Sequence, residues 1–199
     1  MGTRSPQIIL ASASPRRREL LDQLGIAHDA MPANIHEHPR PNESPEAYVR
    51  RMAAEKSLET WRNSGGRLPV LAADTEVVLD GNILGKPQDF GHASRMLSQL
   101  SGREHRVLSA VSLRRGSEHW EAMSISSVTF RRIGHDEIEA YWATGEPRDK
   151  AGAYAIQGKG AVFIRHLSGS YSGVMGLPLF ETAELLRHAG ISVLNLPAS

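Results

Sequence analysis

Residues 10–21 read LASASPRRRELL, where a short apolar run meets the start of a helical pattern. Ser14 suits the N-cap of a helix and Pro15 its first position, where the missing N–H of proline costs nothing. The helix would bury Leu20 and Leu21 and end at Gly25. The pattern therefore predicts a strand that feeds directly into a helix, which is the basic unit of α/β folds.

Three arginines, Arg16 to Arg18, occupy the first turn of this expected helix, where positive charge opposes the helix dipole. The free backbone N–H groups at the same end attract anions. We therefore expect a bound anion to offset the unfavourable charge. A solvated basic turn is the alternative, because short arginine runs are common on protein surfaces.

The chain has 199 residues, of which 23% are charged and 40% are hydrophobic, as in ordinary globular proteins. This length can bury a substantial core, and no linker or shift in composition marks a boundary, so residues 1–199 are predicted to form a single domain. The formal net charge of +1 argues against a broad surface for nucleic acid. No stable nucleic-acid complex is expected.

Cysteine does not occur in the sequence, which excludes disulfides, thiolate zinc sites and cysteine nucleophiles. The first residues, MGTRSPQ, lack the apolar core of a signal peptide. No apolar run approaches the roughly 20 residues of a membrane helix. Together these features predict a cytoplasmic protein without a membrane partner.

Strand-like and helix-like patterns alternate in the first half of the chain, and two longer strand-like stretches follow. This order predicts an α/β protein whose sheet is mixed rather than purely parallel. Asp80 and Gly81 separate two apolar runs as a two-residue hairpin turn does. The expected strands cover residues 8–11, 26–31, 70–73, 77–79, 83–84, 106–113, 120–131 and 162–164, and the expected helices lie at 15–24, 45–64, 93–100, 138–142 and from 178 onward.

Asp74 follows the apolar run at 70–73 and is expected at the tip of that strand, facing the mouth of the sheet. A carboxylate held there can bind a divalent cation or orient a water molecule. Capping a turn or pairing with an arginine is the alternative. Lys86 follows the hairpin, which could fold it back beside Asp74, where its ammonium would neutralise an anion.

Two other segments carry groups that could serve a site. Glu37 lies in a proline-rich loop over 33–45 and could supply a second carboxylate to a metal, although a solvated side chain is the simpler interpretation. Its neighbours His36 and His38 have no third ligand nearby in the sequence, so a zinc site is disfavoured. The glycine-rich segment 149–160 contains Gln157, whose amide offers a donor and an acceptor to a base edge; a glycine-rich turn is the alternative.

These segments, in this order, resemble the Maf family of nucleoside triphosphate pyrophosphatases over nearly the whole chain. No P-loop and no nucleophile elbow of the Gly-x-Ser-x-Gly type is present to suggest a different enzyme class. The motifs that carry the resemblance are LASASPRR at 10–17, RMAAEK at 51–56, ADT at 73–75, GKP at 85–87, LSG with His105 and Val107 at 100–107, DKAGAY with IQG at 149–158, and GLPL at 176–179.

The resemblance implies a twisted, mixed sheet flanked by helices, with two lobes around a cleft, as in inosine triphosphate pyrophosphatases. It implies hydrolysis of a nucleoside triphosphate to its monophosphate and pyrophosphate, by water attack on the α-phosphorus assisted by Mg²⁺ or Mn²⁺. The Tyr-x-x-Gln-Gly sequence at 154–158 is similar to the branch of the family that acts on dTTP and UTP, and modified uridine triphosphates are further candidates. Relatives of this kind are usually homodimers.

Carried over by position, the resemblance makes Asp74 the expected proton acceptor, with Glu37 and Lys86 as catalytic partners. Asp74 and Glu37 would also bind the metal. The residues expected to bind substrate are Ser12, Arg16, Arg17, Lys56, Thr75 and Gln157. Of these, Arg16, Thr75 and Gln157 match positions associated with substrate choice.

The sequence departs from the family pattern at two positions. Glu76 stands where an apolar residue is usual, which adds a charge beside Asp74, and Ser109 stands where threonine is common.

Two alternative functions remain open at this point. One is a non-enzymatic regulator of cell division that binds nucleotide or nucleic acid, and the other is a purine enzyme of the inosine triphosphate type.

Overall fold

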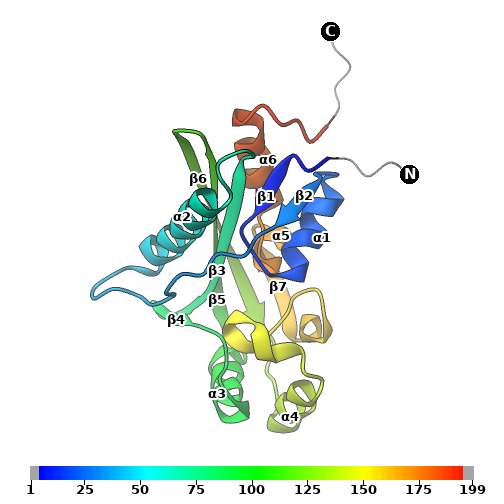
Figure 1. The fold of residues 1–199 in the computed structure, drawn as a ribbon. Coiled ribbons are helices and arrows are strands. Elements are labelled where there is room, and N and C mark those ends of the chain that lie inside the picture. The colour runs from blue at the N-terminus through cyan, green and yellow to red at the C-terminus, as the bar shows by residue number, and fades with distance from the viewer. Residues whose placement is uncertain (1–4, 195–199) are drawn as a thin grey trace.

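The computed structural model describes residues 5–194, which fold around a seven-stranded sheet (Figure 1). The strands lie in the order β2-β1-β3-β5-β6-β7, and β4 pairs with β3 outside this path. The strands are β1 Ile8–Leu10, β2 His28–Ala30, β3 Val70–Leu79, β4 Asn82–Leu84, β5 Glu104–Arg115, β6 Glu118–Phe130 and β7 Ile164–Ser168. The helices are α1 Pro15–Gln23, α2 Pro45–Asn63, α3 Phe90–Leu100, α4 His135–Ala143, α5 Tyr171–Met175 and α6 Leu179–His188, and 3₁₀ turns cover Glu146–Asp149, Ala151–Ala153 and Lys159–Phe163.

The sheet is mixed, which confirms the prediction from the sequence. β1 lies parallel to β2 and β3, whereas the other pairs of described strands are antiparallel. Asp80 and Gly81 form the two-residue turn between β3 and β4, with φ of 51° and 80°. Positive φ at both positions is typical of a type I′ turn, whose twist matches that of a hairpin. The local prediction of this hairpin is therefore confirmed.

The helix starts predicted at Ser14, Ser44 and Pro178 are also confirmed, whereas the helices expected from 93 and 138 each begin three residues earlier. Ser14 and Ser44 are the N-caps of α1 and α2, each followed by a proline in the first turn. The Ser44 hydroxyl accepts the N–H of Ala47 at 3.2 Å. Pro178 is the N-cap of α6. Across residues 5–194, none of the helices combines the length and the apolar character that crossing a membrane requires.

β3 is one continuous strand through Asp74, so the prediction that Asp74 lies at a strand tip is wrong. β5 pairs with β3 along nearly its whole length and places Asp74 opposite Ala110. The other edge of β3 is divided, because β1 pairs only with its first two residues and β4 only with its last three. Residues 72–76 thus keep one edge unpaired among the described strands, and polar side chains are accommodated there without ending the strand.

Successive side chains of β3 point to opposite faces of the sheet, and each face packs differently. Leu71 and Ala73 join a core with α1 and α6, whereas Val77 and Leu79 join a second core with α3 and α4. Thr75 lies on the same face between these cores. Figure 1 shows the two groups of helices toward opposite ends of the sheet, which agrees with the two lobes implied by the resemblance. α2 packs against the other face.

The strand predicted over 162–164 begins only at Ile164, so this prediction is wrong for the first two positions. Residues Lys159–Phe163 form a 3₁₀ turn instead. The carboxylate of Glu146 accepts two backbone N–H groups at the start of the turn, at 2.8 and 3.0 Å. Because this acceptor comes from a distant segment, apolar spacing alone could not reveal the turn.

Gly152 joins the 3₁₀ turn Ala151–Ala153 to the β3–β4 hairpin, since its N–H donates to the carbonyl of Gly85 at 3.1 Å. Its φ is +67°, and a Cβ there would lie 2.9 Å from the side chain of Val77. Gly152→Ala is expected to lower the free energy of unfolding by about 1–3 kcal/mol more than Gly116→Ala, because Gly116 has a φ of +61° but open space around it. Urea denaturation of both variants measures the difference, and equal losses would contradict this steric reason.

Candidate active site

A cavity of about 360 Å³ lies beside the unpaired edge of β3. Asp74 and Thr75 both line it, although adjacent residues of a strand point to opposite faces. The cavity therefore reaches both faces of the sheet around the open edge. The nine residues that the sequence analysis selected all line this cavity: Ser12, Arg16, Arg17, Glu37, Lys56, Asp74, Thr75, Lys86 and Gln157. Their roles in binding and chemistry stay predictions.

The N-terminus of α1 forms one wall of the cavity. Ser14 is the N-cap, but its hydroxyl makes no capping hydrogen bond, and the first turn of α1 contains no acidic residue. The N–H of Ser14 donates to the Oγ of Ser12 at 3.2 Å. The first N–H groups of α1 thus keep the positive potential of a helix N-terminus, which suits an anion such as a phosphate group.

Arg17 is held in place by hydrogen bonds from three of its nitrogens. Its Nε donates to the carbonyl of Gly176 at 2.8 Å, its Nη1 to the Oγ of Ser12 at 3.1 Å and its Nη2 to the Oγ1 of Thr75 at 3.4 Å. Burial lowers the pKa of Arg17 and the charge of Asp74 opposes this shift, but arginine keeps its proton in proteins. Arg17 is therefore a fixed positive charge in the wall of the cavity.

The two neighbouring arginines are placed differently from Arg17. Arg16 lines the cavity, and its Nη1 lies 3.5 Å from an oxygen of the largely exposed Asp149. Arg18 is exposed and donates to the carbonyl of Ala13 at 3.2 Å. Only the two arginines that were expected to bind substrate reach the cavity from this turn.

Lys56 joins two carboxylates on the α2 side of the cavity. Its Nζ lies 2.7 Å from Asp74 Oδ1 and 3.0 Å from Glu37 Oε1. Lys56 and Asp74 are buried, with 8% and 5% of their surface exposed. Lys86 lines the same cavity, but its side chain is exposed and forms no ion pair with any residue that the structure describes. The ammonium in contact with Asp74 is therefore that of Lys56.

The carboxylates of this cluster have shifted pKa values. Burial raises the pKa of Asp74, and the ammonium of Lys56 opposes that shift. Burial, followed by the charge of Asp74, raises the pKa of Glu76 to about 8. Burial also acts to raise the pKa of Glu37, but the contact with Lys56 outweighs it and the pKa falls. Asp74 and Glu37 share the one ammonium of Lys56, and Glu76 beside them ionises more readily when another cation is present, so the cluster favours additional positive charge.

Ser109, one of the two departures from the family pattern, supports Thr75 from β5. The two Oγ atoms lie 2.8 Å apart, and the Ser109 hydroxyl donates to the carbonyl of Gly173 at 2.6 Å. A serine keeps the hydroxyl group that threonine would present. The departure at Ser109 therefore preserves a polar link from β3 to α5.

Sequence analysis missed Lys150, Asp149 and the carbonyl of Gly176 as parts of the site. Lys150 lines the cavity, and its Nζ lies 2.6 Å from Asp149 Oδ1 and 2.8 Å from the carbonyl of Glu146. These residues do lie in the motifs that carried the resemblance, so a signal was present. Their role was missed because the contacts are tertiary: Gly176 is 159 positions from Arg17, which it binds.

The far side of the cavity is formed by the turn that carries Gln157 and by the buried Tyr154. Tyr154 Oη lies 2.9 Å from Nε2 of His105, and burial lowers the pKa of His105 to about 4. A neutral His105 thus supports the wall and supplies no charge. The exposed amide of Gln157 offers a donor and an acceptor to a ligand, as a nucleobase edge requires.

The oxygen atoms of the cluster fit a divalent cation. Asp74 Oδ2 and Glu76 Oε2 are buried without a hydrogen-bond partner, and carboxylate oxygens are the ligands that Mg²⁺ and Mn²⁺ prefer. Within residues 5–194, no group of three or more His, Asp or Glu side chains is placed to hold a metal ion without other ligands. A cation here would complete its shell with water and phosphate oxygens, as Mg²⁺ usually does.

The sequence is similar to proteins with a named activity. It is 58% identical over 192 residues to a dTTP/UTP pyrophosphatase of Methylococcus capsulatus, which covers 96% of this chain and 95% of that protein. It is 55% identical over 198 residues to a dTTP/UTP pyrophosphatase of Nitrosomonas europaea, with 94% and 96% covered. Among solved structures, a nucleoside-triphosphatase / dITP/XTP pyrophosphatase of Mycobacterium abscessus is 20% identical. The match covers 63% of this chain and 75% of that chain, with a TM-score of 0.46.

A family model described as Maf-like protein matches residues 7–189. This range contains every described strand and helix, from β1 to α6, and all the motifs that carried the resemblance. The chain therefore belongs to the Maf family.

Proposed function

We propose that this protein hydrolyses dTTP and UTP to the corresponding monophosphates and pyrophosphate. One observation carries the proposal: the arginine-lined N-terminus of α1 and the cluster of Lys56, Asp74 and Glu37 line one cavity. The names of the relatives that are more than half identical support the choice of substrate. Modified uridine triphosphates are further candidates.

The triphosphate chain would bind between the two charged walls. Its oxygens accept hydrogen bonds from the first N–H groups of α1 and from Arg17, which is already held in position. Lys86 is exposed, and Arg16 has only the 3.5 Å ion pair with the largely exposed Asp149, so both side chains can turn toward the phosphates. These contacts stabilise the negative charge that collects on pyrophosphate as it leaves.

Asp74 is placed to act as the general base. Its Oδ2 has no partner and can accept a proton from water, while Lys56 holds the other oxygen. The water oxygen attacks the α-phosphorus, its proton passes to Asp74, and the bond from the α-phosphorus to the bridging oxygen breaks. Burial raises the pKa of Asp74 above its ordinary value, which makes its carboxylate a stronger base than a solvated one.

A divalent cation, Mg²⁺ or Mn²⁺, would be held by Asp74 and Glu37, with the carboxylate of Glu76 beside them. When bound, it would shield phosphate charge and make the attacking water more acidic. The protein contributes the carboxylates and the buried ammonium of Lys56, which pairs with both Asp74 and Glu37 and so holds them near each other.

The base would lie near the turn that carries Gln157, with Thr75 on the sheet side. The Gln157 amide can donate to one atom of a pyrimidine edge and accept from another. Uracil and thymine present the same donor and acceptor groups, so Gln157 suits both; because its amide can also flip to match a cytosine edge, the choice of uracil and thymine rests on the relatives and not on Gln157 alone. Dimer formation and a cytoplasmic location belong to the same proposal. The family implies the first, and a sequence without cysteine is compatible with the second.

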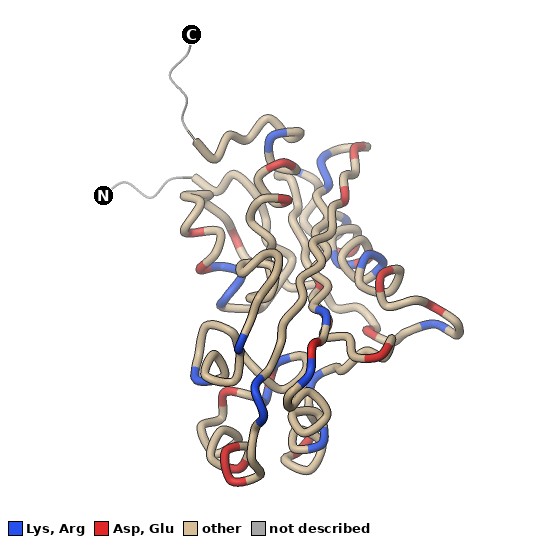
Figure 2. Tube along the Cα trace, turned by 180° about the vertical axis from the view of Figure 1, so that it is seen from behind, with Lys and Arg blue, Asp and Glu red and all other residues tan. Residues whose placement is uncertain are grey.

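The charge distribution is relevant to a nucleic-acid-binding role. Figure 2 shows basic and acidic residues interspersed along the chain instead of gathered in one region, and the net charge is +1. Binding to nucleic acid depends on clustered positive charge and weakens steeply with salt. An enzyme with a local anion site fits this distribution better.

Pyrophosphate release across a panel of nucleoside triphosphates tests the proposal. With Mg²⁺ or Mn²⁺, dTTP and UTP should be hydrolysed at least about 10-fold faster than ITP or GTP, since a hydrogen-bonding pocket rejects bases with the wrong edge. Faster hydrolysis of ITP would favour the purine alternative. Tight, salt-sensitive binding to nucleic acid without pyrophosphate release would overturn the proposal in favour of a regulator.

Asp74→Asn keeps the size of the side chain but removes the base. The variant is expected to lose at least about 10²–10⁴-fold in kcat, the usual contribution of a general base, while nucleotide still binds. Asp29→Asn, on the exposed end of β2, is the matched control and should keep full activity. Near-normal turnover by Asp74→Asn would refute the assignment.

Glu76 is expected to make stability depend on pH. Its folded pKa of about 8 lies above the ordinary value of 4.5. The unfolded chain therefore loses this proton at lower pH than the folded protein does, and the free energy of unfolding falls as pH rises from about 4.5 to about 8. Without divalent cation, Glu76→Gln should be more stable than wild type by at least about 1.4 kcal/mol near pH 8.5, the value of one pKa unit. The gain should shrink toward pH 5.

Urea denaturation at both pH values measures this effect. Glu118→Gln, on an exposed residue at the start of β6, provides the control and should show no pH-dependent gain. An equal gain for Glu76→Gln at both pH values would mean that the charge of Glu76 is not the cause.

A further inference from the structure

The segment over residues 31–44 connects β2 to α2 and contains no helix or strand. It carries Glu37, whose carboxylate reaches Lys56 inside the cavity although 45% of the Glu37 side chain is exposed. A loop of this length has many accessible conformations, and each one places Glu37 differently. Something in the fold must therefore hold this segment if Glu37 is to serve the site.

α2 holds the segment at successive points along its length. Thr60 donates to the carbonyl of Met31 at 3.2 Å, and Lys56 binds Glu37 at 3.0 Å. Arg51 donates to the carbonyl of His38 at 3.0 Å. The contacts move toward the start of α2 as the segment advances, so the segment runs antiparallel to the helix and ends at its N-cap.

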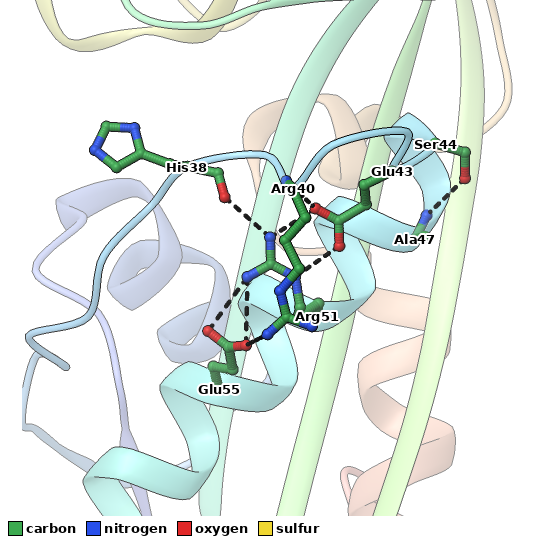
Figure 3. Close-up of polar contacts among 7 residues, drawn as sticks. All are labelled: His38, Arg40, Glu43, Ser44, Ala47, Arg51 and Glu55. Atoms are coloured by element: carbon green, nitrogen blue, oxygen red, sulfur yellow. Dashed lines mark hydrogen bonds and ion pairs between the residues drawn. The ribbon is translucent and has the colours of Figure 1, made fainter.

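Arg51 contacts two glutamates and the backbone of the segment at the same time (Figure 3). Its Nε and Nη2 each lie 2.6 Å from an oxygen of Glu43, and its Nη1 lies 3.3 Å from Glu55 Oε1. Nη2 also reaches the carbonyl of His38. Arg40 completes the group, since its N–H donates to Glu43 at 2.9 Å and its Nη2 to Glu55 at 3.2 Å.

This network is stronger than a typical surface ion pair. The side chains of Arg51 and Glu43 are only 15% and 10% exposed, and their bidentate geometry is the favourable one for arginine. The two arginines and two glutamates of this network balance each other in charge. Glu37 is not part of it and pairs with Lys56 instead. Arg51 and Lys56 are separated by about 7.5 Å along the axis of α2, which is rigid.

We propose that Arg51 is a positioning residue for the reaction, which acts by anchoring the 31–44 segment so that Glu37 meets Lys56 and Asp74. The contact with the carbonyl of His38 fixes the backbone one position after Glu37. The inference rests on the proposed function, because it assigns Glu37 a role in pyrophosphate release.

Arg51→Ala and Arg51→Lys test the anchor directly. Lysine keeps the charge but cannot make the bidentate contact and reach His38 as well. In hydrogen exchange, both variants should speed exchange over residues 33–43, where the N–H groups of Arg40 and Glu43 are bonded in the wild type. Arg50→Ala is the matched control, because Arg50 is the exposed neighbour on α2. Unchanged exchange in the Arg51 variants would overturn the proposal.

A double-mutant cycle tests whether Arg51 acts through Glu37. Arg51→Ala should lower kcat/KM for UTP by about 10–100-fold, as small misplacements of catalytic groups do. In a Glu37→Gln background the same change should cost less than about 2-fold. An equal loss in both backgrounds, or full activity of Glu37→Gln alone, would overturn the proposal. If the wild type releases no pyrophosphate at all, the proposed function fails, and hydrogen exchange then decides alone whether Arg51 anchors the segment.

Discussion

The buried contact of Lys56 with Asp74 is the interaction on which the site depends. A carboxylate in the middle of a buried strand is costly unless a charge or hydrogen bonds compensate it. Lys56 provides that compensation at 2.7 Å and reaches Glu37 with the same ammonium. Because Asp74 and Glu37 together carry more negative charge than the one ammonium of Lys56 balances, the cluster attracts cations. One residue of α2 thus both compensates the buried charge of Asp74 and brings Glu37 to the site.

The open edge of β3 gives a ligand access to this cluster. β1 leaves β3 after two paired residues and β4 joins it only at the far end, so Asp74 and Thr75 can line one cavity from opposite faces of the sheet. A continuous neighbour strand would have separated them. The same division places one core on each side of Thr75, so the cavity lies at the junction between the two lobes.

α2 connects the parts of the site that come from different regions. Arg51 and Lys56 lie about one and a half turns apart on this helix. Arg51 holds the 31–44 segment, and Lys56 joins that segment to β3. The catalytic geometry we propose therefore relies on a helix that contributes little of the substrate surface itself. Residues such as Arg51 belong to the motifs of the family, although they lie outside the cavity.

Local chemistry in the sequence determined the starts of α1 and α2 and the hairpin at Asp80 and Gly81, because capping, proline geometry and positive φ act over a few positions. The nine site residues came from the resemblance of ordered motifs to the Maf family, and the fold gathers them around one cavity. Tertiary structure alone decided that Asp74 lies within β3, that Lys56 instead of Lys86 contacts it, and that Gly176 binds Arg17. These outcomes depend on which strands pair and which charges become buried together. Both are set by contacts between distant segments, which no local pattern encodes.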